Sequence, residues 1–170
     1  MGPDIPVKDD PTITAYRWLS KQMISRVGHP PRGVKYPVWL WPKKPDLRIG
    51  EHGMPGDELV MMEVEITDEK VVLTDFMLWS FPYSGFFIPH PYKDYLKFKR
   101  ELKEAGLDEH GMKRLPLSFH SRVEKSWELV FDLNCSNRSL TSSGPDKIIQ
   151  ACVWELRLDQ VVGKRKFKCR

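Results

Sequence analysis

The segment at residues 36–42 constrains the fold more than any other stretch. It places two tryptophans, Trp39 and Trp41, two residues apart between two prolines. In an extended strand both indoles point to one face. The other face takes Tyr36, Val38 and Leu40. The prolines restrict such a strand to the edge of a sheet or to the end of its ladder. Because both faces carry large apolar groups, we expect both faces to be covered.

Two interpretations of this strand remain open. In the first, Trp39 and Trp41 are aromatic anchors of a buried strand. In the second, their shared face forms the wall of a ligand pocket, with Arg48 at its rim to meet an anion. Only the second interpretation requires a cavity beside the strand.

Composition predicts a folded protein that occupies residues 1–170 as a single domain. The chain is 41% hydrophobic and 29% charged, which excludes overall disorder and allows a normal core. No apolar run reaches the length of a membrane-spanning helix, so we expect no membrane contact. Residues 1–10 carry acidic groups without an apolar core and are expected to form a flexible N-terminal lead.

Cysteine and histidine usage predicts a protein without cofactor or metal. The three cysteines, Cys135, Cys152 and Cys169, have spacings that fit neither a zinc site nor a redox pair. An odd count is also a poor disulfide framework, which favours a reducing, cytoplasmic compartment. The histidines are scattered singly, so we expect no metal site.

Periodicity along the first half predicts alternating helices and strands. Asp10 and a following proline begin a helix that Gly28 ends. Alternation predicts a strand at 58–66, with a hairpin partner at 71–73. Thr74 or Asp75 caps a short helix that Pro82 stops.

The second half adds further helices and strands. A helix is expected at 92–105, and the apolar spacing at 123–131 favours another, with a strand as the alternative. A strand is expected at 148–158 with Cys152, Trp154, Leu156 and Leu158 inward and Val153 outward. Residues 161–167 form a last strand or a tail. The fold class is therefore α+β, a small, mainly antiparallel sheet with three to four helices packed against it.

Two surface features bear on partners. Residues 81–95 are rich in aromatic side chains and prolines, and we expect packing on the core rather than a lid or an interface. The net charge is +4, and residues 163–170 form a basic C-terminal tail. Its cations are Lys164, Arg165, Lys166, Lys168 and Arg170. Such a tail attracts phosphates and predicts nucleic-acid binding, although an ordinary solvated terminus has the same composition.

The assembled motifs resemble a bacterial and phage family catalogued as a domain of unknown function (family 3841). The blocks that carry the resemblance are Tyr-Arg-Trp-Leu at 16–19, Tyr-Pro-Val-Trp-Leu-Trp at 36–41, Lys-Pro-Asp-Leu-Arg at 44–48, Glu-Val-Glu-Ile at 63–66, Leu-Thr-Asp-Phe at 73–76, Lys-Ser-Trp at 125–127 and Cys-Val-Trp-Glu-Leu at 152–156. They run in order over most of the chain.

The resemblance implies no established activity. Polar family positions kept here are Gln22, Arg48, Asp75, Gln150 and Glu155. Two departures matter. The family usually opens with a strand that bears a Thr-Ile-Gln-like motif, which residues 1–10 lack. It also tends to place a histidine after the tryptophan that matches Trp79, where this chain has Ser80.

We therefore expect a small binding or regulatory protein that contacts a protein or a nucleic acid. No Gly-rich phosphate loop, nucleophile elbow or zinc signature is present, and the family's phage occurrence is compatible with a protein that masks a host component. The alternative is a nucleotide- or nucleic-acid-directed enzyme similar in layout to ADP-ribosyltransferases. Glu155 would be its catalytic carboxylate, and Arg48 would hold phosphate. That alternative requires Arg48, Gln150 and Glu155 to converge in one concave site.

Overall fold

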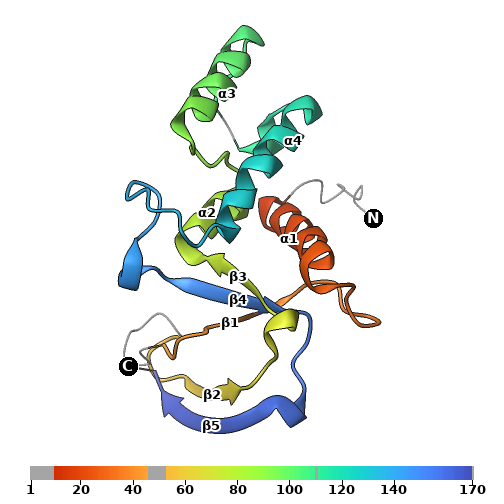
Figure 1. Cartoon of the computed structure of the whole chain (residues 1–170), viewed down its shortest axis with the longest axis vertical. Helices are drawn as coiled ribbons and strands as arrows, with labels where there is room; N and C mark the ends of the chain where they lie inside the picture. Colours follow the sequence, from red (N-terminus) through yellow and green to blue (C-terminus); the bar gives the residue numbers. More distant parts are fainter. Residues whose placement is uncertain (1–9, 46–52, 110, 170) are drawn as a thin grey trace, which may run out of the picture.

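The computed structural model describes residues 10–45, 53–109 and 111–169. These residues form an α+β fold, as the sequence predicts. Its helices are α1 (Pro11–Val27), α2 (Phe76–Ser84), α3 (Tyr92–Glu104) and α4 (Leu117–Ser126). Its strands are β1 (Val38–Leu40), β2 (Glu58–Val64), β3 (Val72–Asp75), β4 (Ile149–Val153) and β5 (Val161–Lys168). Figure 1 shows α3 and α4 at one end of an elongated molecule and the β2–β5 pair at the other. The lead expected at residues 1–10 lies, apart from Asp10, outside the described residues.

Helix α1 has the boundaries that its capping residues predict. The Asp10 carboxylate accepts a hydrogen bond from the Thr12 N–H at 2.9 Å, and Pro11 occupies the first turn. Gly28 ends the helix at a φ of 86°, a conformation that side chains with a Cβ adopt rarely. The buried face carries Trp18, Leu19 and Met23.

Strand β1 is an edge strand, as its flanking prolines predict. The three-stranded sheet has the order β1-β4-β3, and every pairing is antiparallel. The expectation that both faces of the tryptophan segment are covered is wrong, because Val38 and Trp41 are exposed. Trp39 packs against Tyr16 of α1 and Trp79 of α2. Strand β1 ends at Leu40. Trp41 therefore lies beyond the strand and is 41% exposed.

The predicted hairpin between β2 and the next strand is also wrong. A 3₁₀ turn at Asp68–Lys70 follows β2, and β3 then pairs with β4. Strand β2 pairs instead with β5, about a hundred residues away along the chain. The burial of the two strands explains the difference. Strand β3 is buried along most of its length and belongs to the central sheet, whereas β2 alternates and stays half exposed.

Strand β4 is shorter than its alternating pattern predicts. It ends at Val153, and Leu158, expected inward, is 91% exposed. Val153, expected outward, is buried, because β4 is the central strand and has structure on both sides. Of the two readings of residues 161–167, the strand is correct.

Helix α2 begins at the predicted cap but passes through the proline that was expected to stop it. The Asp75 carboxylate accepts hydrogen bonds from the N–H groups of Met77 and Leu78. Pro82 lies inside the helix, which ends at Gly85 with a φ of 73°. A proline in this last turn removes only one helical hydrogen bond, since the following N–H groups are free to continue the turn.

The core lies where α1, α2 and the segment after α4 meet. Trp127 is fully buried at the start of a 3₁₀ helix, which supports the helical alternative for this region. Its ring meets that of Trp18 edge-on at 5.5 Å. The aromatic segment at 81–95 is divided: Phe87 and Ile88 are buried, as expected, while other members remain exposed.

Candidate functional site

A cavity of about 420 Å³ opens between α1, β1, α2 and β4. We call it the aromatic pocket, because five of its eight lining residues are aromatic. Its lining consists of Tyr16, Trp39, Phe76, Met77, Trp79, Ser80, Tyr83 and Gln150. The volume falls within the range typical of small-ligand and side-chain pockets.

Helix α2 supplies most of this lining because of where it begins. Asp75 ends β3 and caps α2, so the helix starts directly at the sheet. Phe76, Ser80 and Tyr83 then recur at spacings of four and three, which places them on one helical face. Trp79 shares this face and closes the floor of the pocket, where it is largely buried.

The pocket walls are held in a defined arrangement. The Trp39 and Trp79 ring centroids are 4.9 Å apart, and the Tyr16 ring stands edge-on to both, at 6.4 and 6.1 Å. The Trp39 Nε1–H donates a hydrogen bond to the Tyr16 hydroxyl at 3.0 Å. Since this bond satisfies the indole N–H, the wall presents its aromatic surface to the cavity without an unpaired donor from Trp39.

Among the residues that the structure describes, the lining includes no aspartate, glutamate, lysine, arginine or histidine. Its polar side-chain groups are hydroxyls, the indole N–H groups of Trp39 and Trp79, and the amide of Gln150. The Ser80 hydroxyl donates to the Met77 carbonyl at 2.8 Å. Ser80 also occupies the position where members of the resembled family usually have a histidine. The described lining therefore suits an uncharged group. It lacks the pair of titratable side chains that general acid–base catalysis requires.

Exposed apolar side chains continue from the pocket mouth onto the surface. Phe76, Met77 and Tyr83 line the cavity and are also substantially exposed. The Trp41 ring packs against Phe76 with centroids 5.5 Å apart. On the other side, Tyr36 meets Tyr16 edge-on at 5.7 Å. An apolar surface around an apolar pocket is typical of a site that contacts a partner.

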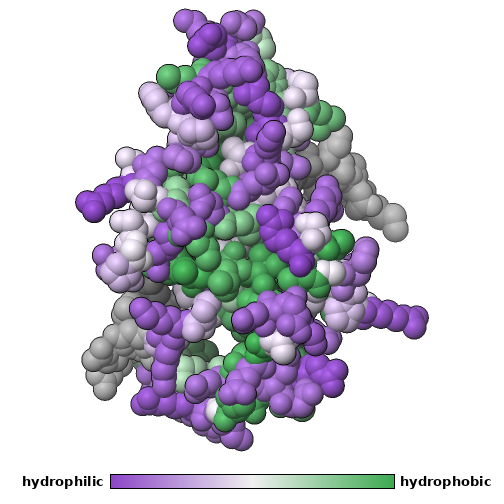
Figure 2. Space-filling model, in the orientation of Figure 1, coloured by the Kyte–Doolittle hydropathy of each residue, from purple (hydrophilic) through white to green (hydrophobic). Residues whose placement is uncertain are grey.

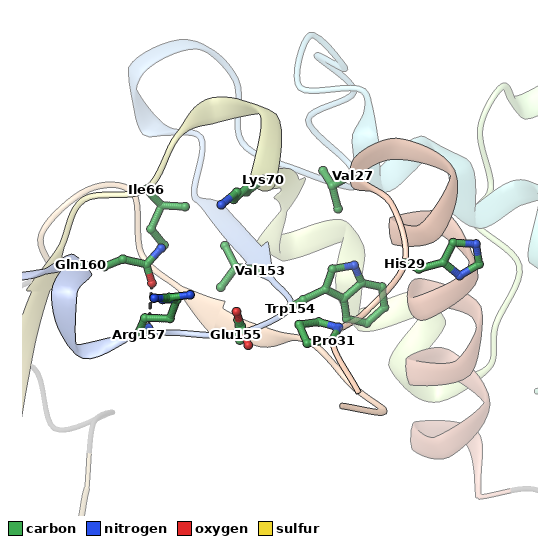
Figure 3. Close-up of a pocket in the computed structure, with 10 residues that line it drawn as sticks. All are labelled: Val27, His29, Pro31, Ile66, Lys70, Val153, Trp154, Glu155, Arg157 and Gln160. Carbon is green, nitrogen blue, oxygen red and sulfur yellow. Dashed lines mark hydrogen bonds between the residues drawn. The ribbon is translucent and has the colours of Figure 1, made fainter. Parts of the chain in front are cut away.

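A second cavity, of about 250 Å³, lies beyond the carboxyl end of β4. We call it the charged cavity, since Lys70, Glu155 and Arg157 line it (Figure 3). Trp154 forms part of its wall and donates its indole N–H to the Gly28 carbonyl at 2.8 Å. The charged groups come from two separate segments, the turn after β2 and the loop after β4.

One charge at this cavity, that of Arg157, is paired with an exposed carboxylate. Arg157 Nε donates to the Asp159 carboxylate at 3.1 Å. This hydrogen bond, followed by the charges of Asp159 and Glu155, raises the pKa of Arg157 above its ordinary value. The same hydrogen bond lowers the pKa of Asp159. Because both side chains are solvent-exposed, this ion pair contributes little to stability.

The structure brings two of the predicted site residues together in one pocket and places Gln22 and Glu155 elsewhere. Trp39 and Gln150 both line the aromatic pocket, and Trp41 reaches its rim through Phe76. Gln22 lines neither cavity, and its amide oxygen accepts a hydrogen bond from Arg26 on α1. Arg48 lies outside the described residues.

Glu155 lines the charged cavity and not the pocket that contains Gln150. The five residue steps from Gln150 to Glu155 span roughly 16 Å along an extended chain. The two residues therefore do not converge, although the enzyme alternative requires them to.

The basic segment at the end of the chain lies in β5. Cross-strand pairing sets Lys164 opposite Met62, Lys166 opposite Val60 and Arg165 opposite Met61. Successive side chains point to opposite faces of a strand. The sequence cluster is therefore split, with Lys164, Lys166 and Lys168 on one face and Arg165 on the other.

Sequence reasoning missed several pocket residues. Tyr16 belongs to an amphipathic stripe, and Trp79 and Phe76 to a short helix, so their periodicity indicates only burial against the core. Tyr83 was assigned to an irregular segment. The one available signal was that Tyr16 and Phe76 lie in the family blocks at 16–19 and 73–76, and sequence alone does not connect these blocks in space.

Two classes of site find no support in the part of the chain that the structure describes. No described helix combines the length and the apolar character needed to cross a membrane. Within the same residues, no three side chains among His, Cys, Asp and Glu gather closely enough to hold a metal ion.

Comparison with known proteins identifies one matching family. The family described as "Domain of unknown function (DUF3841)" matches residues 7–162. Neither a curated protein nor a solved structure matches the chain.

Proposed function

This chain belongs to the DUF3841 family, a domain of unknown function, and we propose that it is a non-catalytic binding protein that recognises a partner protein. The observation that carries the proposal is the aromatic pocket, whose lining is apolar, aromatic and uncharged. A partner places an apolar or aromatic side chain in this pocket, against Trp39, Trp79 and Tyr83. Binding of this kind serves a regulatory role, because it covers a surface of the partner without altering it chemically.

The composition of the site favours a protein over a nucleic acid as occupant. Tryptophan, tyrosine, phenylalanine and methionine are the residues enriched at protein interfaces. A nucleic acid brings phosphates wherever it brings a base, and the described residues of the pocket lining include no cation to meet them. The exposed apolar rim at Trp41, Phe76 and Met77 suits the surroundings of an inserted side chain, which must exclude water.

The proposal is tested by titrating capped amino acids into ¹⁵N-labelled protein and following the indole N–H signals of its six tryptophans. N-acetyl-tryptophanamide is the first probe. It has about 18 heavy atoms, and about −0.3 kcal/mol for each gives about −5 kcal/mol, or a Kd of about 0.2 mM. The signals of Trp39 and Trp79 shift, whereas those of Trp127 and Trp154 stay in place. The latter two donate to the carbonyls of Phe86 and Gly28, away from the pocket.

A pair of exposed tyrosines supplies matched variants. Tyr83→Ala removes a pocket wall and weakens binding roughly 3- to 10-fold, because an aromatic contact contributes about 0.5–1.5 kcal/mol. Tyr92→Ala removes a tyrosine that is also exposed but lies on α3, outside the pocket, and leaves binding unchanged.

Three outcomes contradict the proposal. The first is the absence of any shift at about 10 mM of the tryptophan, phenylalanine and leucine probes, far above the Kd worked out above. The second is a shift of all six indole signals, which indicates nonspecific association. The third is a preference for adenosine over the capped amino acids, because the pocket would then take a nucleobase.

A further inference from the structure

Strands β2 and β5 form a two-stranded antiparallel ribbon at one end of the molecule. Figure 1 shows β5 as the outermost strand, on the side away from the helices. The pairing runs in register from Glu58 opposite Lys168 to Glu63 opposite Gly163, and an irregularity follows before Val64. Two more backbone hydrogen bonds, between residues 56–57 and Cys169, extend the ladder.

The two faces of the ribbon differ in what they present. Directly opposed residues share a face. One face, which we call the lysine face, carries Glu58, Val60, Met62, Val162, Lys164, Lys166 and Lys168, all of them exposed. On the opposite face, Leu59, Met61 and Phe167 are half-buried.

The apolar residues of the lysine face are unusually open to solvent. Val60 is 53% exposed, and Met62 and Val162 are each 56% exposed. Figure 2 shows hydrophobic surface interleaved with hydrophilic surface at this end of the molecule. Val60 lies opposite Lys166 and Met62 opposite Lys164, so a row of lysines on β5 runs beside an apolar row on β2.

Charge is also segregated between the faces. Three lysines and one glutamate give the lysine face a formal charge of +2 (3 − 1), whereas Arg165 and Glu63 leave the opposite face at zero (1 − 1). The charge that looks like a terminal tail in the sequence is thus held on one side of a rigid ribbon. A cationic face of this kind is complementary to a polyanion.

We propose that the lysine face binds duplex DNA, with the ribbon lying in the major groove. The major groove is about 12 Å wide and admits a two-stranded β-ribbon. Lysines on such a ribbon reach phosphates and the acceptor edge of guanine, and apolar side chains contact the thymine methyl group. A face on which a row of lysines runs beside valine and methionine supplies both kinds of contact. This site is separate from the aromatic pocket and does not depend on it.

The same face is poorly suited to single strands. Proteins that bind single-stranded nucleic acid stack bases on aromatic side chains, and the lysine face carries none. An anionic membrane surface shares the negative charge of DNA, so lipid vesicles are included as a test arm.

The test measures fluorescence anisotropy of labelled duplexes of roughly 20 base pairs, about two helical turns, with the full chain over a range of salt concentrations. Replacing Lys164, Lys166 and Lys168 together by glutamine lowers affinity and flattens the dependence of log K on log salt. The expected change in slope is about 2.7, because each neutralised phosphate contributes about 0.9. Circular dichroism checks that the variant folds.

The matched control removes three exposed lysines from α3 instead: Lys93→Gln, Lys97→Gln and Lys103→Gln. This control has the same net charge as the β5 variant and keeps most of the affinity. A second contrast uses an alternating dA·dT duplex and its dA·dU counterpart, which lacks the thymine methyl group in the major groove. The wild-type chain prefers the thymine duplex, and Met62→Ser reduces that preference.

Four results overturn the proposal. An equal loss of affinity in the α3 variant shows that net charge alone governs binding. Equal affinity for the thymine and uracil duplexes excludes the major-groove contact. Tighter binding to single strands excludes the groove geometry. Binding to vesicles of phosphatidylserine and phosphatidylcholine without binding to DNA assigns the face to a membrane surface.

Discussion

Replacing Asp75 by asparagine tests whether its buried ion pair with Lys147 holds the serine-rich loop before β4 (residues 134–148) to the central sheet. Asp75 is 0% exposed and the Lys147 side chain 6% exposed. Asp75 Oδ2 accepts hydrogen bonds from Lys147 Nζ at 2.7 Å and from the Thr141 hydroxyl at 2.5 Å. The other carboxylate oxygen caps α2 through the N–H groups of Met77 and Leu78. Asp75 thus links the end of β3, the start of α2 and two positions of the loop, Thr141 and Lys147.

The expected cost follows from this geometry. An asparagine that keeps its oxygen at the α2 cap turns its NH₂ group toward Lys147 and Thr141, so both donors lose the carboxylate. The buried Lys147 ammonium then keeps only the neutral Cys135 carbonyl, at 2.9 Å, as its acceptor. Removing one partner of a buried ion pair destabilises a protein by roughly 3–5 kcal/mol, because the remaining charge stays buried without compensation. For a domain whose total stability is about 5–15 kcal/mol, this is a large fraction.

The measurement is urea unfolding followed by tryptophan fluorescence and circular dichroism near neutral pH, for Asp75→Asn, Lys147→Met and the double variant. Removing the second partner relieves the uncompensated charge. The double variant should therefore be no less stable than Asp75→Asn, with a coupling free energy of at least about 2 kcal/mol. The control is Asp159→Asn, which breaks the exposed pair with Arg157 and should leave stability unchanged within error.

Two results would refute this reasoning. A loss below about 1 kcal/mol for Asp75→Asn would place the pair in the class of exposed salt bridges. Additive losses in the double variant would show that Asp75 and Lys147 act independently, and the stabilisation would then come from the α2 cap alone.

Two further predictions concern protonation and reactivity. The Tyr95 hydroxyl donates to Glu109 at 2.6 Å, and this bond, with burial, raises the pKa of Tyr95 from 10.0 to about 12. Because the folded protein holds the Tyr95 proton more tightly than the unfolded chain does, the bond stabilises the fold fully below pH 10.0, and this stabilisation is lost as pH rises toward 12. In unfolding experiments, the difference in stability between wild type and Tyr95→Phe should therefore vanish across that range. Burial raises the pKa of the Cys152 thiol, so it should resist a thiol reagent in the native protein and react once the chain is unfolded. Fast native labelling of Cys152, identified by mass spectrometry, would contradict this.

Local signals predicted the helices well. The α1 boundaries follow from Asp10, Pro11 and Gly28, whose capping and backbone preferences act within one helical turn. Asp75 was identified as a cap for the same reason. Pro82 was misjudged, since the effect of a proline depends on how many helical bonds remain after it, which the rest of the helix decides.

Strand pairing was predicted less well, because it joins residues that are distant along the chain. Alternation identified the strand at 58–66 but not its partner, and the nearest strand was chosen where β5 is the true one. The alternating pattern at 148–158 also continued past Val153, where β4 ends. Periodicity reports which side chains alternate, but it does not report where hydrogen bonding stops.

The sequence by itself determined the α+β class, the helix caps, the edge position of the Trp39 strand and the basic character of the chain end. Only the tertiary structure decided that Trp39 and Gln150 share a pocket, that Glu155 belongs to another cavity, and that the lysines of β5 occupy one face. Caps and periodicity arise from contacts within a few residues, which the sequence contains directly. Pockets and faces arise from which distant segments pack together, and that is set by the free energy of the whole fold.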